Sequence, residues 1–335
     1  MPDALLTEPP ALRVQDLTVR FRRRGLDVAA VNGVSFSLAR GETLTILGES
    51  GSGKSVSLKA LMGLLPQYAS TEGTVWLDGR SVLDLPNSEL AKLRGGAISM
   101  IFQEPMAALD PVYTIGQQIA ETIVQHEGVS QATAMKRALD LLDHVKIPSA
   151  ARRLKNFPHE MSGGMRQRAM IALALACSPS VLLADEPTTA LDVTVQIQIL
   201  LLLRQLQEEL GMAIVFVTHD VGAAAEISDR IAVMYAGRFV ETATAREIMR
   251  TPRHPYTQGL LASTVHGGLR GRVLETIPGS PPNLAELPPG CAFAPRCRHA
   301  AEVCTHGEIP VVTASSGAMV RCVRAVPVPA LEVPA

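Results

Sequence analysis

The sequence predicts an α/β fold, in which a parallel sheet is joined by an antiparallel β subdomain, a helical subdomain and a small cysteine-containing C-terminal extension. Three observations predict it. Short aliphatic runs, such as 43–47 and 181–184, are typical of buried parallel strands. Amphipathic runs such as 196–210 are typical of helices. A glycine-rich turn at 48–53 joins one predicted strand to a predicted helix.

The antiparallel part is predicted from residues 11–47. Apolar and polar residues alternate along this segment, and Arg40-Gly41-Glu42 forms a turn before the next strand. Residues 73–79 predict a further strand and turn, and a polar helix is expected near 88–93. These elements bracket the glycine-rich turn.

A phosphate-binding loop is predicted where Gly48, four residues and Gly53-Lys54-Ser55 form the pattern G-x-x-x-x-G-K-S. A strand at 43–47 precedes it, and a helix over 55–65, ended before Pro66, follows. Glycines let backbone N–H groups approach a phosphate, and the helix N-terminus adds its positive dipole end. The expected nucleotide-binding residues are Gly48, Glu49, Ser50, Gly51, Ser52, Gly53, Lys54 and Ser55. The alternative is an ordinary Gly/Ser turn.

Individual roles follow from charge and ring chemistry. We expect Lys54 to neutralise the β- and γ-phosphates of a nucleotide triphosphate and Ser55 to ligate Mg²⁺. Phe21 is the aromatic residue expected to stack on adenine, since a planar base gains from a π face. The alternative for Phe21 is a strand residue that faces the core.

A helical subdomain is expected at about 96–165. Phe102 closes a short apolar strand and Gln103 begins a loop, after which residues 114–160 show helical periodicity with charged faces. Ser162-Gly163-Gly164 then precedes an apolar helix, whose N-terminus is suited to an anion.

Two carboxylates end the predicted strand at 181–185. We expect Asp185 to hold Mg²⁺, directly or through water, and Glu186 to orient and deprotonate an attacking water. Acids at the end of a buried strand are costly unless a cation or polar network receives them; the alternative is simple exposure. His219 ends the next buried strand and is expected to reach the γ-phosphate, although a histidine there is more often structural.

Composition narrows the class of protein. The net charge of −1 gives no reason to expect a nucleic-acid partner. No apolar run reaches the roughly 18 residues that span a bilayer, and residues 1–10 lack a signal-peptide core. We therefore expect a cytosolic protein, able to dock on a membrane partner.

These motifs, in this order, resemble those of the nucleotide-binding subunit of ABC transporters over residues 11–250, and residues 1–250 are expected to form that cassette. The resemblance implies a head-to-tail dimer of cassettes, in which Ser162, Gly163 and Gly164 bind the γ-phosphate of the partner's ATP. It also implies that Gln103 senses Mg²⁺ and that Asp192 crosses the dimer interface. Met165 departs from the usual Gln, and we expect ATP binding to survive that change.

A closer resemblance links residues 251–335 and the signature region to ATP-binding subunits of oligopeptide/dipeptide permeases. It implies a peripheral subunit on the cytoplasmic face of the inner membrane. Its partners would be a second cassette, with a paralogue favoured, two transmembrane permease subunits and an extracytoplasmic solute-binding protein. Importers of nickel, metallophores or oligosaccharides are the alternatives within the subfamily.

The sequence disfavours two other classes of ABC protein. A soluble ABC ATPase of DNA repair or translation needs a long coiled coil or two cassettes, whereas only residues 55–161 separate Lys54 from Ser162 and no second phosphate loop occurs. A non-catalytic regulatory cassette needs a defective loop or a defective Glu186, and both are intact.

Four cysteines gather near the C-terminus: Cys291, Cys297, Cys304 and Cys322. Unrelated thiols, disulfides and a four-thiolate metal site are the alternatives, and a reducing cytosol disfavours disulfides. The gaps are wider than the C-x-x-C pairs usual for zinc, while iron–sulfur clusters use more varied spacings. The permease resemblance implies a [4Fe–4S] cluster, with zinc as the alternative and His299 or His306 as replacement ligands. We expect it to pin the extension to the cassette, well away from ATP.

Overall fold

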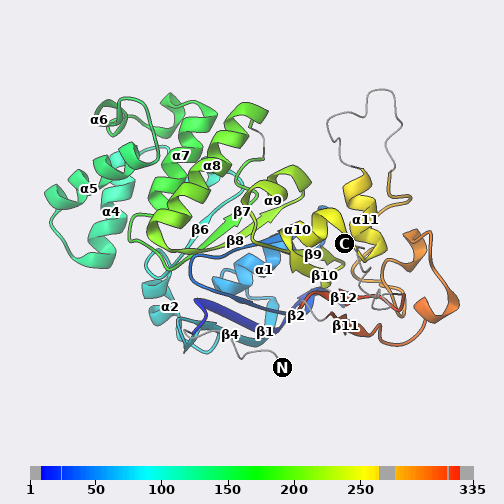
Figure 1. Cartoon of the computed structure of the whole chain (residues 1–335). Coiled ribbons are helices and arrows are strands. Elements are labelled where there is room, and N and C mark those ends of the chain that lie inside the picture. The colour runs from blue at the N-terminus through cyan, green and yellow to red at the C-terminus, as the bar shows by residue number, and fades with distance from the viewer. Residues whose placement is uncertain (1–8, 24, 190, 264–275, 315–316, 325–335) are drawn as a thin grey trace.

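An eight-stranded mixed sheet forms the centre of the molecule in the computed structural model, which describes residues 9–23, 25–189, 191–263, 276–314 and 317–324 (Figure 1). The strand order is β11-β12-β10-β9-β3-β8-β7-β6, parallel from β9 to β6 and antiparallel elsewhere. The strands are β3 (Thr43–Leu47), β6 (Ile98–Ile101), β7 (Val181–Asp185), β8 (Ala213–Thr218), β9 (Arg230–Tyr235), β10 (Arg238–Thr244), β11 (Val311–Thr313) and β12 (Met319–Arg321). Strands β3, β7 and β8 are buried at every residue, as their unbroken aliphatic runs predict.

A second, antiparallel sheet has the order β2-β1-β4-β5, which confirms the predicted antiparallel part. Its strands are β1 (Leu12–Arg23), β2 (Leu26–Leu38), β4 (Ala69–Leu77) and β5 (Arg80–Ser81). Helix α1 (Lys54–Leu61) shares one apolar core with both sheets. It ends at Leu61, earlier than the predicted residue 65, because Gly63 adopts a left-handed conformation (φ 60°) just beyond it.

The helical part lies between β6 and β7 in the chain and forms one end of the molecule in Figure 1. Side-chain caps set its helix starts: Thr114 with a capping box, Ser130 and Ser162. Its own apolar core joins the sheet at β7 and β8. Its elements are α3 (Pro105–Ala108), α4 (Ile115–Glu127), α5 (Gln131–His144), α6 (Ala150–Arg153), η1 (Pro158–Glu160) and α7 (Gly163–Ala174). Helix α2 (Asn87–Leu93) precedes β6, and its Leu90 belongs to the core shared with the antiparallel sheet.

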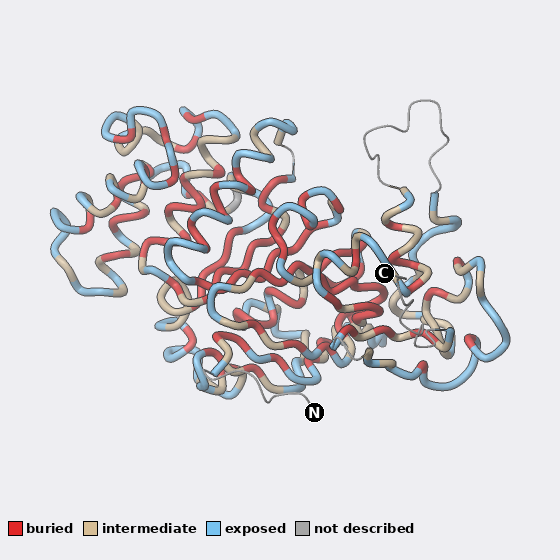
Figure 2. The backbone as a smooth tube through the Cα atoms, in the orientation of Figure 1, coloured by how far each residue is buried: buried red, intermediate tan, exposed pale blue. Residues whose placement is uncertain are grey.

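Helices α8 (Val193–Leu210) and α9 (Val221–Ile227) follow β7 and β8, and each begins at an aspartate cap, Asp192 and Asp220. The buried strands run through the middle of the molecule, with exposed residues on the outer helices (Figure 2). Among the described residues, no helix is both long enough and apolar enough to cross a bilayer.

The C-terminal extension is tied into the central sheet. After α10 (Ala245–Arg250) and α11 (Pro255–Ala262), the chain returns through η2 (Ala294–Arg296) and η3 (Glu302–Cys304) to β11 and β12, and β12 pairs with β10. The rings of Tyr235, Tyr256 and Phe293 pack together across this junction. The proline-rich segment 277–290 contains no helix or strand, and a second proline-rich segment at 326–335 lies outside the described residues. The predicted domain boundary at residue 250 and the helical limits at 96–165 stay predictions.

Candidate nucleotide-binding site

The glycine-rich loop follows β3 and lies tightly against neighbouring backbone. At Gly48 an added Cβ would lie 2.3 Å from the carbonyl oxygen of Met234. At Gly53, which has φ 107°, it would lie 2.3 Å from the carbonyl oxygen of Ala30. Both positions therefore require glycine, and the loop is held between β2 and β9. The buried Ser52 hydroxyl has no hydrogen-bond partner in the described structure, so a polar group in the loop is left for a ligand.

Lys54 begins α1 and is buried, with its ammonium donating to the carbonyl oxygens of Gly48 (2.8 Å) and Glu49 (2.9 Å). Its Nζ also lies 3.9 Å from Glu186 Oε1. Burial lowers the pKa of Lys54, while the charges of Glu186, Asp185 and Glu49 oppose that shift. A lysine held here by backbone carbonyls is placed to exchange those contacts for phosphate oxygens.

Ser55 and Asp185 meet at the carboxyl end of β7, where the serine hydroxyl donates to Asp185 Oδ1 at 2.7 Å. Burial raises the pKa of Asp185, and the hydrogen bond from Ser55 acts in the opposite direction. A hydroxyl and a carboxylate side by side are the oxygen ligands that Mg²⁺ prefers. The residues present therefore fit a magnesium ion as predicted for Ser55 and Asp185.

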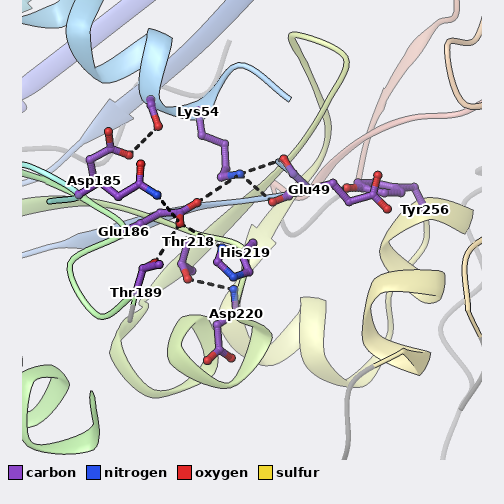
Figure 3. Close-up of polar contacts among 12 residues, drawn as sticks. Glu49, Lys54, Asp185, Glu186, Thr189, Thr218, His219, Asp220 and Tyr256 are labelled. Atoms are coloured by element: carbon purple, nitrogen blue, oxygen red, sulfur yellow. Dashed lines mark hydrogen bonds and ion pairs between the residues drawn. The ribbon is translucent and has the colours of Figure 1, made fainter. Parts of the chain in front are cut away.

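Glu186 stands at the centre of a polar cluster (Figure 3). Its Oε2 accepts hydrogen bonds from the Gln103 amide (3.3 Å) and the Thr189 hydroxyl (3.0 Å), and lies 3.2 Å from His219 Nδ1. The Glu186 backbone has φ 46°, an uncommon conformation for a non-glycine residue. Its N–H donates to the carbonyl of Val217, which fixes this turn against β8. The structure thus brings together the three predicted catalytic side chains.

A cavity of about 730 Å³ opens beside this cluster. Its walls include Lys54, Ser55, Gln103, Glu186 and His219, and also Leu260, Ile277 and Leu284 from beyond residue 250. Among the described residues, no Phe, Tyr or Trp lines it.

Phe21 lies instead in β1, partly buried against the core, with its ring centroid 6.0 Å from that of Tyr68. This partial packing agrees with the alternative for Phe21, while its stacking on adenine stays a prediction. Its predicted adenine contact has no support from the cavity walls.

Several predicted ligands of ATP lie outside the cavity walls. Ser162 caps α7 by accepting from the Met165 N–H (3.4 Å), and Gly163 and Gly164 begin that helix. Asp192 caps α8 by accepting from the Val195 N–H (2.9 Å). The Met165 side chain packs against the helical core. Within one chain, residues 162–164 therefore do not line the same cavity as the phosphate loop. The ATP-binding roles predicted for Ser162, Gly163, Gly164 and Asp192 stay predictions.

The four C-terminal cysteines share one narrow cavity of about 20 Å³. All are free thiols, and burial raises the pKa of Cys291 and of Cys297, with Cys304 and Cys322 adding to both shifts. However, within the described part of the chain no group of three or more His, Cys, Asp or Glu side chains is arranged to hold a metal ion. The zinc alternative and the [4Fe–4S] cluster are therefore not supported by side-chain grouping.

One prediction about the extension is wrong. Its segment around the cysteines does not lie well away from the ATP chemistry, because Arg296 donates to both carboxylate oxygens of Glu49 in the phosphate loop. Sequence reasoning also missed Thr189 and Tyr256, whose hydroxyls contact Glu186 and the Glu49 N–H respectively. Thr189 stands three residues after Glu186, and this short spacing could have indicated the contact between them. No local sequence pattern indicates the contacts that Arg296 and Tyr256 make with Glu49.

Comparison with known proteins agrees with this site. The chain matches the family model "ABC transporter" over residues 31–189 and "Oligopeptide/dipeptide transporter, C-terminal region" over residues 240–304. It is 50% identical over 315 residues to the oligopeptide transport ATP-binding protein OppD of Salmonella typhimurium, covering 94% of each chain. It is 48% identical over 295 residues to the dipeptide transport ATP-binding protein DppD of Bacillus subtilis, covering 88% of each.

Among solved structures, a dimeric ATP-binding cassette in a post-hydrolysis state bound to ADP and Pi is similar, with a TM-score of 0.63 and 32% identity. The match covers 70% of this chain and 99% of that cassette. The phosphate loop, the carboxylates at the end of β7 and these relatives lead to the same assignment. The chain belongs to the ABC transporter family, among the ATP-binding proteins of oligopeptide and dipeptide transport.

Proposed function

We propose that Glu186 activates the water that attacks ATP in this chain, with Gln103, Thr189 and His219 orienting its carboxylate. The chain is the ATP-hydrolysing motor of an importer for di- and oligopeptides, as its relatives and its C-terminal family match indicate. The observation that carries the catalytic proposal is the convergence of those side chains on Glu186 Oε2, at 3.3, 3.0 and 3.2 Å.

The contacts of each side chain indicate its role in ATP hydrolysis. Lys54, held 2.8 Å from the Gly48 carbonyl, binds phosphate oxygens and neutralises their charge. Ser55 and Asp185 would hold Mg²⁺, which supplies further charge neutralisation at the phosphates. Glu186 takes the proton from the attacking water, a general-base role that a positioned carboxylate can perform.

The working unit is a dimer of cassettes together with permease subunits. We assign Ser162, Gly163 and Gly164 to the ATP held by the partner cassette, because they lie outside the cavity that their own chain forms. Asp192 would cross that interface. We propose a paralogous cassette as the partner, two transmembrane permease subunits, an extracytoplasmic solute-binding protein and a position on the cytoplasmic face of the inner membrane, where ATP is available.

Reconstitution tests the substrate class. The complete transporter in vesicles is expected to import labelled di- and oligopeptides only when ATP is supplied on the side of the cassettes. A Glu186→Gln transporter serves as the control, since it should bind the same peptide and import none. Import of nickel, a metallophore or an oligosaccharide in place of peptides would assign the chain to one of those importers and overturn the peptide proposal.

A second proposal concerns the cysteines. We propose that Cys291, Cys297, Cys304 and Cys322 hold a [4Fe–4S] cluster, because all four line one cavity. A four-iron cluster is larger than one ion and separates its thiolates further, so it does not need the close grouping that a single zinc ion requires. Protein purified without oxygen is expected to be brown, with roughly four irons per chain. Stoichiometric zinc in colourless protein, or folded and active protein with neither metal, would contradict the cluster.

A further inference from the structure

Three different side chains form hydrogen bonds with Glu49 in the phosphate loop, each at a different group of this residue. Its N–H donates to the Tyr256 hydroxyl at 2.9 Å, and its carbonyl accepts from the Lys54 ammonium at 2.9 Å. Its carboxylate accepts from Arg296 Nη1 at 2.8 Å and from Nη2 at 3.1 Å. The loop pattern leaves this position open to any residue, so phosphate binding alone does not require a glutamate here. Two of the three contacts come from beyond residue 250.

Arg296 is rigidly placed for this contact. Its side chain is 7% exposed, its Nε donates to the Pro278 carbonyl at 2.9 Å, and Nη1 also donates to the Tyr235 hydroxyl at 3.3 Å. The hydrogen bonds that the guanidinium donates to Glu49 raise the pKa of Arg296 above its usual value. A planar guanidinium that is hydrogen-bonded on several edges can hold a carboxylate in one orientation.

The extension also reaches the nucleotide cavity with apolar side chains. Leu260, Ile277 and Leu284 line it, and Leu260 belongs to α11, the helix that also contains Tyr256. At Gly259 an added Cβ would lie 2.9 Å from Ile277 Cγ1, so α11 and the segment after residue 276 are in close contact. The extension thus touches the ATP site at two independent places, a charged contact and an apolar wall.

We propose that Arg296 is a positioning residue for ATP binding: through Glu49 it holds the phosphate loop in the conformation that receives the phosphates. The inference rests on the ATP site described above and deepens it, because it makes nucleotide affinity depend on a residue 247 positions away in the chain. A contact that served only to attach the extension would change stability and leave the affinity for ATP unchanged. This difference makes the proposal testable.

The experiment uses the full chain and measures the Kd for ATP by calorimetry without Mg²⁺, so that no hydrolysis intervenes. Arg296→Met is expected to weaken ATP binding at least fivefold, and Arg296→Lys to restore part of the loss. Hydrogen exchange of the amides at 48–55 should become faster in Arg296→Met. The matched control is Arg238→Met, which removes another arginine–glutamate contact between cassette and extension, 3.9 Å from Glu308, and should leave the Kd within twofold of the wild type.

A double variant separates positioning from stability. Arg296→Met leaves the Glu49 carboxylate without its main partner, which by itself destabilises the fold. Combining it with Glu49→Gln removes that charge, and the Tm is expected to recover while ATP binding stays weak. Recovery of the affinity together with the Tm would overturn the proposal, as would an Arg296→Met protein that binds ATP within twofold of the wild type. Wild-type protein that bound no ATP would instead refute the nucleotide site itself.

Discussion

Two glycine-containing helix N-termini in this molecule look alike in sequence and differ in their surroundings. The phosphate loop at 48–55 lies against β2 and β9, and its Lys54 and Ser55 face the carboxylates at the end of β7. The segment Ser162–Gly164 begins α7 away from that cavity, and its serine only caps the helix. The first turn forms most of a binding site within one chain, whereas the role proposed for the second turn requires ATP held by a partner cassette.

The strongest test of this contrast is to disable the catalytic group beside the phosphate loop while ATP binding is kept. Glu186→Gln should lower ATP hydrolysis roughly 10²–10⁴-fold, because the general base is lost. ATP affinity should stay within a few-fold, since Lys54 and the loop glycines are untouched. Turnover by the assembled transporter is the measurement. Hydrolysis within threefold of the wild type would show that Glu186 is not the base.

The same substitution in the two turns should act with opposite sign. In Gly53→Ala the added Cβ would clash with the Ala30 carbonyl, and alanine would have to adopt a positive φ. This substitution should therefore destabilise the chain by about 2–4 kcal/mol. Gly163→Ala meets only Leu191 Cδ2 at 3.9 Å, and alanine at a helical position should be neutral or stabilising by about 0.5–1 kcal/mol. Urea unfolding of both proteins checks this. Equal losses at the two positions would contradict the contrast.

Removing the ammonium from the first turn should affect binding directly. Lys54→Ala is expected to weaken ATP binding roughly 10- to 100-fold, since charged hydrogen bonds contribute about 1.5–3 kcal/mol. Lys59→Ala, on the exposed side of the same helix, is the control and should bind normally. Tight ATP binding by the Lys54 variant, measured by calorimetry, would count against the loop assignment.

The smallest expected effect concerns the second turn. Ser162→Ala and Ser130→Ala each remove a serine cap and should each cost about 1 kcal/mol of stability. Only Ser162→Ala should also reduce hydrolysis in the assembled dimer, while ATP binding to the single chain stays unchanged. If both variants reduced hydrolysis equally, the effect of Ser162 would be ascribed to capping alone.

The sequence was most informative where chemistry depends on local spacing. The loop from Gly48 to Ser55, and Asp185 with Glu186 at the end of an apolar run, lie where these patterns predict. His219 also reaches Glu186, because β7 and β8 are parallel neighbours and their carboxyl ends share one edge of the sheet.

Prediction failed where the partner is distant in the chain. The contact between Arg296 and Glu49 joins residues 247 positions apart, so no local pattern could indicate it. The extension was expected to lie away from ATP because only the composition of the segment around its cysteines was considered. That composition gives no information about the contact with the phosphate loop.

The pairing of β12 with β10 has a consequence for how the chain can be divided. In the whole chain, the outer side of β10 is covered where Glu241 and Thr242 pair with Val320 and Met319. A fragment cut at residue 250 would leave those N–H and C=O groups as an open strand edge, which favours association with other chains. Such a fragment is therefore expected to aggregate even though it contains every ATP-binding motif. The extension thus protects the sheet that holds the catalytic residues from edge-to-edge association with other chains.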